Sequence, residues 1–300
     1  MKFNWKRVGL IAGLSLTLAA AGCGSAEDTD TTDDEGAKDT AADGGEVELT
    51  YVEWDSEVAS THVIGKVLED LGYDVTLTPL DNSVMWEAVA NGEVDGSVSA
   101  WVPLTHEAQI EQYGDQVEHL GPNLEGAKIG LVVPSYMDVD SIADLSGEAD
   151  QTITGIDAGA GVVAAAERSL DDYDNLDGWE VQTSSSGAMT TELGQAYENE
   201  EDIIVTGWTP HWKFQAYDLK YLEDPKGTFG EAETLDTFVR EGLKEDAPEV
   251  YQILDNFYWE SEDMEAVMMD IHEGTDPEEA AAAWVEENPG KVAEWAEGIE

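Results

Sequence analysis

Residues 46–134 carry two spacings of apolar positions, one typical of strands and the other of helices. Short apolar runs predict buried strands at 47–53, 75–80, 98–102 and 128–134. Apolar positions three or four residues apart predict helices at 58–71, at 104–113, and around Met85, Trp86 and Val89. Gly72 and Gly92 follow two of these helices, as is common at helix ends. The pattern predicts a β-α-β-α-β unit followed by a further helix and strand.

A second series with the same order occupies residues 152–208. It predicts strands at 152–156, 179–183 and 202–206, and helices at 162–170 and from Ser186 onward. Each series ends in a strand followed by Trp-x-Pro, at Trp101 and at Trp208. We interpret this as an internal duplication that gives two α/β lobes. Later segments predict a return strand at 237–240 and helices at 248–257, 262–272 and 277–296, the last packing against the first lobe.

The N-terminus has the features of a targeting segment. Lys2, Lys6 and Arg7 precede an apolar stretch at 8–21 that is too short to span a bilayer. Small residues then precede Cys23, the only cysteine, which resembles a bacterial lipoprotein signal; an ordinary secretory signal with an incidental cysteine is the alternative. We therefore expect a signal peptide at 1–22, cleaved before a lipidated Cys23.

The rest of the chain is predicted to form a tether, which its composition indicates, and two lobes, which the order of the predicted elements indicates. Residues 23–45 are acidic and lack aromatic and large aliphatic side chains, so they predict an unstructured, lipid-anchored tether. We expect lobe 1 to comprise 46–134 and 236–300, and lobe 2 to comprise 135–235.

The charge balance narrows the classes of partner. The chain has 67 acidic and 13 basic residues, a formal net charge of −54. Such a surface disfavours nucleic acid and anionic lipid and suits a cell living in high salt. One cysteine excludes a disulfide framework, and the five histidines lack metal-ligand spacing, so we expect no metal. The Gly-rich turn at 157–161 lacks dinucleotide spacing, so we expect no cofactor.

Three tryptophans stand where predicted strands end: Trp54, Trp101 and Trp208. Ligands of open α/β sheets lie outside the carboxyl ends of strands, so these indoles are expected in one crevice. Three indole faces suit a cation that donates no hydrogen bonds, above all a quaternary ammonium. The alternative is that they are unrelated core residues. That packing role is the one we assign to the following five: Trp86, Trp179, Trp259, Trp284 and Trp295.

An anion site is predicted beside the indoles. Gly161 and Val162 open a predicted helix, where free backbone N–H groups and the helix dipole favour a carboxylate or phosphate. His106 could donate a further hydrogen bond to the same anion, although a surface position at a helix start is the commoner role for such a histidine.

Several motifs together resemble one family. VEWDSE, SAWVPLTH, GIDAGAGV and TGWTPHW make residues 47–300 similar to the extracytoplasmic glycine betaine-binding proteins of OpuA-type ABC importers. Some relatives carry the two halves in the opposite order. The resemblance implies a two-lobed type II periplasmic-binding-protein fold with the ligand in the interlobe cleft.

The resemblance also implies roles for particular residues. Trp54, Trp101 and Trp208 would surround the trimethylammonium group of glycine betaine or proline betaine. The amides of Gly161 and Val162 would hold the carboxylate, assisted by His106. The protein would perform no catalysis and would deliver its ligand to a permease and an ATPase on separate chains, for osmoprotection at the outer face of the cell membrane.

Two other functions stay open at this point. A secreted carbohydrate-binding or glycoside-hydrolase protein would use aromatic platforms beside acids such as Asp55 and Glu57, but it requires a carboxylate pair across the cleft, and none is evident. An amino-acid receptor would place acidic residues, rather than indoles, around the ligand ammonium.

Overall fold

The computed structural model describes residues 44–299. The predicted signal peptide, Cys23 and nearly all of the predicted tether lie outside these residues. None of the helices between residues 44 and 299 is long and apolar enough to cross a bilayer.

The first β-α-β-α-β unit consists of β1 (Glu46–Tyr51), α1 (Asp55–Asp70), β2 (Asp74–Pro79), α2 (Asn82–Ala90) and β3 (Gly96–Val102). Strand β1 lies between β2 and β3 and is parallel to both. Helix α1 covers this sheet because its apolar side chains recur at helical spacing and are buried. Its acidic first turn, which includes Asp55 and Glu57, suits the positive end of the helix dipole.

The second unit repeats this arrangement. It consists of β5 (Thr152–Thr154), α4 (Gly161–Asp172), β6 (Glu180–Gln182), α5 (Ser186–Asn199) and β7 (Val205–Thr209). Strand β5 lies between β6 and β7 and is parallel to both, as β1 is in the first unit. The strand order therefore confirms the duplication predicted from sequence.

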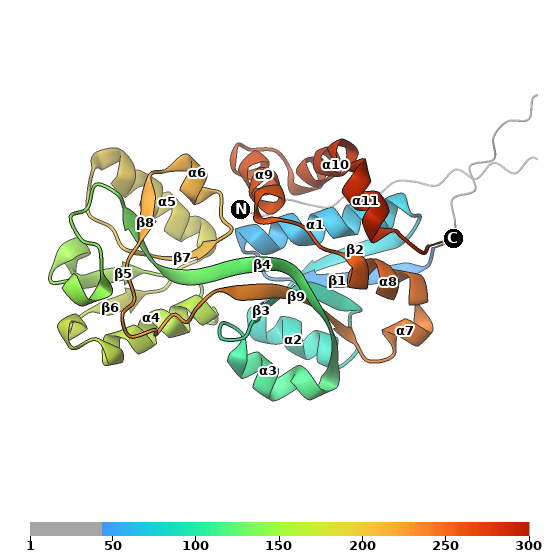
Figure 1. The fold of residues 1–300 in the computed structure, drawn as a ribbon, viewed down its shortest axis with the longest axis horizontal. Coiled ribbons are helices and arrows are strands. Elements are labelled where there is room, and N and C mark those ends of the chain that lie inside the picture. Colours follow the sequence, from blue (N-terminus) through green and yellow to red (C-terminus); the bar gives the residue numbers. More distant parts are fainter. Residues whose placement is uncertain (1–43, 300) are drawn as a thin grey trace, which may run out of the picture. The chain divides into compact units, whose positions relative to one another are not determined.

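Strand β4 (Val117–Pro134) joins the sheets of the two units. Its first part pairs with β9 (Glu233–Arg240), which lies against β3, and its last part pairs with β7 and β8 (Leu219–Tyr221), all antiparallel. Figure 1 shows β4 as the long green strand running through both sheets. The sequence predicted only residues 128–134 of it. The earlier part is half exposed, and its register with β9 shifts three times, so its apolar positions do not alternate.

The remaining helices are α3 (Glu107–Tyr113), α6 (Lys213–Ala216), α7 (Leu243–Asp246), α8 (Pro248–Asn256), α9 (Ser261–His272), α10 (Pro277–Glu287) and α11 (Pro289–Trp295). Helices α9 and α10 pack against α1, as Figure 1 shows. Short 3-10 turns occupy Gly114–Gln116, Ile142–Asp144, Glu148–Gln151 and Asp174–Leu176.

Several predicted elements differ from the structure in their bounds, and two of these differences have a clear physical reason. The single helix expected at 277–296 is two helices, because Pro289 has no N–H to donate and instead takes the first position of α11. The strand expected at 202–206 begins only at Val205, so Trp208 lies inside β7 rather than after it. The apolar pair Ile203 and Ile204 is buried in the approach to the strand, which explains the misplaced start.

The five tryptophans assigned to packing are all buried, with at most 7% of each side chain exposed. Trp86 stacks on Phe238 of β9 with 4.1 Å between ring centroids. Trp284 of α10 stacks on Trp295 of α11 at 5.6 Å. These contacts confirm the packing prediction.

Candidate ligand-binding site

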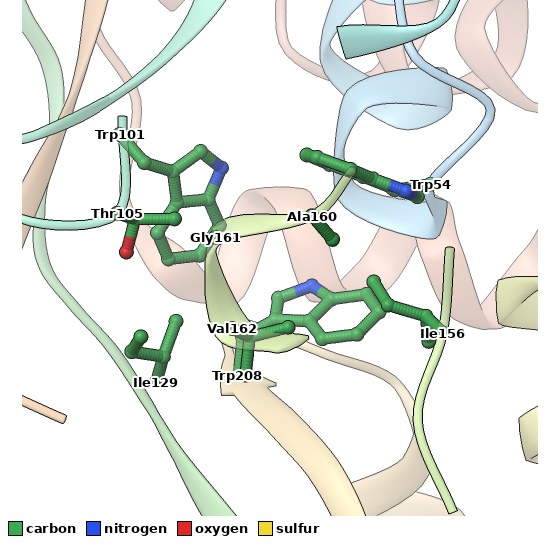
Figure 2. A pocket seen from close by; sticks show the side chains of 9 residues that line it. All are labelled: Trp54, Trp101, Thr105, Ile129, Ile156, Ala160, Gly161, Val162 and Trp208. Atoms are coloured by element: carbon green, nitrogen blue, oxygen red, sulfur yellow. The ribbon is translucent and has the colours of Figure 1, made fainter. Parts of the chain in front are cut away.

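The three tryptophans that end or follow predicted strands line one pocket. Figure 2 shows the indoles of Trp54, Trp101 and Trp208 around the same space. The remaining lining residues are Thr105, Ile129, Ile156, Ala160, Gly161 and Val162. The space between atoms amounts to about 280 Å³, including the part open to solvent. Nine residues line this space, so it fits a small molecule rather than a sugar chain or peptide.

The duplicated topology explains how these residues meet. Trp54 follows β1 and caps α1, while Gly161 follows β5 and begins α4. Trp101 and Trp208 lie near the carboxyl ends of β3 and β7, the third strand of each unit. Each unit thus contributes its first and its third strand to the pocket, at the edge where ligands of open α/β sheets bind.

All three indoles donate their N–H group to protein acceptors, two of which lie in the opposite unit. Trp54 Nε1 donates to Asp157 Oδ2 at 3.2 Å, and Trp208 Nε1 donates to Ser56 Oγ at 3.1 Å. Trp101 Nε1 donates to Glu57 Oε1 at 2.7 Å. With its one donor satisfied, each indole presents only carbon surface and its π face to the pocket.

The start of α4 offers hydrogen-bond donors to the same pocket. The backbone N–H groups of Gly161 and Val162 donate to no acceptor within residues 44–299. A side chain at position 161 has no room, because a Cβ there would lie 2.1 Å from the carbonyl oxygen of Thr105. Thr105 lies in the loop at 103–106 between β3 and α3, called the Thr105 loop below. Glu233 of β9 fixes this loop by accepting from the backbone N–H groups of Leu104 at 2.7 Å and Thr105 at 2.9 Å.

His106 is fully buried beside the pocket but does not line it. Its Nδ1 accepts from the backbone N–H of Trp101 at 3.1 Å, so the neutral ring carries its proton on Nε2. Burial lowers the pKa of His106 to about 3. Nε2 has no partner within the described residues. The ring centroid lies 6.2 Å from that of Trp54. It is a buried donor, not the surface residue that its sequence position most often predicts.

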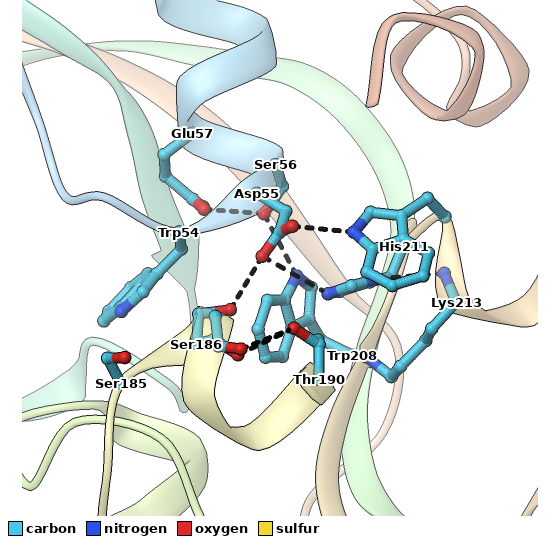
Figure 3. A network of polar contacts seen from close by, with 12 residues as sticks. Trp54, Asp55, Ser56, Glu57, Ser185, Ser186, Thr190, Trp208, His211 and Lys213 are labelled. Atoms are coloured by element: carbon cyan, nitrogen blue, oxygen red, sulfur yellow. Dashed lines mark hydrogen bonds and ion pairs between the residues drawn. The ribbon is translucent and has the colours of Figure 1, made fainter. Parts of the chain in front are cut away.

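Asp55, which the sequence did not single out as a binding residue, joins the two units. It accepts from Ser186 Oγ at 2.7 Å (Figure 3). It also accepts from Trp212 Nε1 at 2.6 Å, and its Oδ2 lies 3.6 Å from His211 Nε2. Burial alone would raise the pKa of Asp55, but the His211 ring and the two hydrogen bonds together hold that pKa well below its ordinary value. No local sequence pattern indicates these partners, which are more than 130 residues away.

The two acids that a glycosidase would use are committed to other groups. Asp55 is engaged by Ser186, Trp212 and His211, and Glu57 by Ser56 and Trp101. Neither acid lines the pocket. In the part of the chain that the structure describes, no cluster of three histidine, cysteine or acidic side chains could hold a metal ion.

Comparison with known proteins gives one consistent result. Residues 45–287 match the family model OpuAC, the substrate binding domain of ABC-type glycine betaine transport system. The glycine betaine/carnitine transport binding protein GbuC of Listeria monocytogenes is 52% identical over 175 residues, which are 58% of this chain and 57% of that protein. The match therefore spans little more than half of that relative's length.

Solved structures agree with this assignment. Lactococcal OpuAC, in its closed-liganded conformation with glycine betaine, has a TM-score of 0.83 and 55% identity, covering 84% of this chain and all of that one. The glycine betaine, L-proline-binding protein ProX of Borrelia burgdorferi has a TM-score of 0.80 and 35% identity, covering 83% of this chain and 96% of that one. The expected α/β periplasmic-binding-protein fold is confirmed, and a carbohydrate-active function finds no support.

Proposed function

We propose that this chain is an extracytoplasmic receptor that captures glycine betaine. It belongs to the family of substrate-binding domains of ABC-type glycine betaine transport systems. The observation that carries this proposal is the small pocket walled by Trp54, Trp101 and Trp208, with free backbone N–H groups at one side. Proline betaine has the same two chemical features and is a second ligand of the class.

The indoles would hold the quaternary ammonium group. A trimethylammonium head donates no hydrogen bond, so it loses little on leaving water for a wall of aromatic faces, each of which attracts the cation. The walls are at most 6% exposed, so the contact is desolvated and therefore strong. A primary ammonium would instead leave its N–H groups without acceptors.

The start of α4 would hold the carboxylate. The amides of Gly161 and Val162 and the positive end of the α4 dipole favour an anion. His106 would add a charge-assisted hydrogen bond from Nε2, the donor that has no partner within residues 44–299. A ligand with both charges a short distance apart satisfies both ends of the pocket.

The ligand would sit between two lobes, 46–134 with 236–300 and 135–235. The first would contribute Trp54 and Trp101, and the second Trp208 and Gly161. Closing the lobes would therefore bring the three indoles together into a cage around the ammonium group. The pairing of β4 supports a crossing between the lobes a few residues before 134, because β4 pairs with β9 up to Ala127 and with β7 from Lys128.

The ligand would pass to a membrane permease driven by an ATPase, both on separate chains, and no reaction would be catalysed. The absence of catalysis is supported by the engagement of Asp55 and Glu57 with indole and hydroxyl groups. Lipidation of Cys23 would tether the receptor to the outer face of the cell membrane.

Titration calorimetry of the full-length protein with glycine betaine, dimethylglycine, sarcosine and glycine tests this function. Each methyl group removed exposes an N–H that must be desolvated without an acceptor, at about 1–3 kcal/mol, and removes apolar contact worth about 0.8 kcal/mol. Affinity should fall stepwise along the series. Glycine binding more tightly than glycine betaine would reject the indole cage in favour of an amino-acid receptor.

A further inference from the structure

Glu57 is a carboxyl side chain that is completely buried in the first turn of α1. Both of its oxygens accept hydrogen bonds, and both bonds lead to walls of the pocket. Oε1 accepts from Trp101 Nε1 at 2.7 Å. Oε2 accepts from Ser56 Oγ at 2.6 Å, and Ser56 Oγ accepts in turn from Trp208 Nε1 at 3.1 Å. Figure 3 shows the Ser56 part of this chain of contacts.

The surroundings of Glu57 do not otherwise favour an acid. In the described residues it forms no ion pair, and the charge nearest in sequence is that of Asp55. Burial raises the pKa of Glu57 to about 7. A buried carboxyl without a cation costs folding free energy that a leucine of similar size would not. Packing alone therefore gives no reason for an acid at this position.

We infer that Glu57 is the positioning residue of the cage, setting the planes of Trp101 and Trp208 and making the pocket selective for a cation over a neutral group of the same shape. This inference rests on the proposed function. An indole has a single donor at its edge, so an acceptor there fixes the rotation of the ring about its bond to Cβ. A cation–π contact requires the cation over the ring face within about 6 Å, so this rotation decides its strength.

The same bond acts on the electrons of the ring. A carboxyl oxygen that accepts the indole N–H pushes electron density toward the ring, which strengthens its attraction for a cation. A neutral group in contact with the same face gains nothing from this. Glu57 thus acts on the head group through two indoles without touching the ligand itself.

The test compares glycine betaine with tert-butylacetate, which has the same shape and carboxylate but a carbon in place of the charged nitrogen. Titration calorimetry would measure both affinities for the full-length wild type and for Glu57→Leu, Glu57→Gln and Ser56→Ala. Glu118→Leu is the matched control, because Glu118 of β4 accepts a hydroxyl hydrogen bond from Tyr251 away from the pocket. Thermal unfolding of each variant reports folding.

Glu57→Leu should weaken glycine betaine on the order of 10- to 30-fold, the worth of one desolvated cation–π contact, and tert-butylacetate much less. The ratio of the two affinities therefore falls. Glu57→Gln keeps an oxygen for Trp101 and should restore most of the ratio, while Ser56→Ala, which frees only Trp208, should lie between. Glu118→Leu should leave both affinities unchanged.

An unchanged ratio in Glu57→Leu, whether both affinities fall equally or neither falls, overturns the inference, since a role in packing alone moves both ligands together. If Glu57→Leu does not fold, Ser56→Ala decides by the same ratio, and an unchanged ratio in that variant overturns the inference. Trp101→Ala separates this failure from that of the proposed function. If Trp101→Ala binds glycine betaine normally, the cage itself is wrong. If Trp101→Ala is weakened while Glu57→Leu and Ser56→Ala keep the wild-type ratio, only the role of Glu57 is wrong.

Discussion

Gly161→Ala should separate ligand binding from folding stability. A Cβ at position 161 would lie 2.1 Å from the carbonyl oxygen of Thr105 and 2.7 Å from its Cγ2, whereas real Cβ contacts stay above 3.0 Å. The Thr105 loop cannot yield easily, because Glu233 holds it by two backbone N–H groups. The first and second units would therefore have to separate by about 1 Å at this contact.

That displacement falls on the pocket itself, since Gly161 and Thr105 both line it. A misplacement of about 1 Å at a catalytic site lowers the rate on the order of 100-fold, and we take the same scale for the affinity of a preorganised binding site. We expect glycine betaine to bind Gly161→Ala about 100-fold more weakly. The backbone at Gly161 is not in the left-handed region, and alanine favours helices by up to about 1 kcal/mol, so the unliganded variant should be as stable as wild type or slightly more so.

The assay is titration calorimetry with glycine betaine alongside thermal unfolding without ligand. Gly187→Ala is the matched control, because Gly187 also lies in the first turn of a helix, α5, and a Cβ there would meet nothing within 4 Å. It should gain similar stability and keep its affinity. If Gly161→Ala binds glycine betaine as wild type does, Thr105 and Gly161 do not approach each other in the bound state, and the reasoning fails.

Three other outcomes are expected. Trp208→Ala, and likewise Trp54→Ala and Trp101→Ala, should lose about 1–3 kcal/mol of glycine betaine affinity by calorimetry, with phenylalanine losing less; unchanged affinity in Trp208→Ala would remove that wall from the cage. Choline, which lacks the carboxylate, should bind more weakly than glycine betaine by about 1.5–3 kcal/mol or more; equal affinities would place the anion site elsewhere. Lys213 is fully buried, its Nζ has no hydrogen-bond partner in residues 44–299, and burial lowers the pKa of Lys213 to about 7. The unfolded chain keeps that proton up to about pH 10.4, so wild-type stability should gain from Lys213 as pH rises above 7. Lys213→Met should be more stable than wild type at pH 7, on the order of a few kcal/mol. Urea unfolding between about pH 7 and pH 10 should show that the variant's stability no longer rises with pH as that of the wild type does; the same rise in the variant would mean that another group titrates.

The sequence was sufficient for the repeated units because their strands are short, apolar and bounded by turns. It was also sufficient for the walls of the pocket, since a tryptophan at the carboxyl end of a strand in an open α/β sheet lies at the ligand-binding edge. Gly161 could be found because a glycine-rich turn that opens a helix is a recognisable pattern.

The supporting residues could not be found in this way. Asp55 and Ser56 follow Trp54 directly, but their partners Ser186, Trp208 and Trp212 are 131 to 157 residues away. Only the packing of the first unit against the second brings these groups together. The sequence presented Glu57 only as an acid beside an aromatic position, because burial is a property of the assembled fold and not of the local pattern.

The hydrogen bonds that cross between the units also determine how fast a ligand can exchange. Trp208 is joined to Ser56, Trp54 to Asp157, and the side-chain amide of Asn82 to the carbonyl oxygen of Gly159 at 3.2 Å. A ligand enclosed by these walls can leave only after such bonds break, so its residence time is set by the opening of the protein as well as by its own contacts. Entry is subject to the same step, and the observed association rate should therefore level off at high ligand concentration instead of rising linearly. If the protein is the receptor proposed above, slow spontaneous release would favour transfer to a transporter at the membrane over loss to the medium.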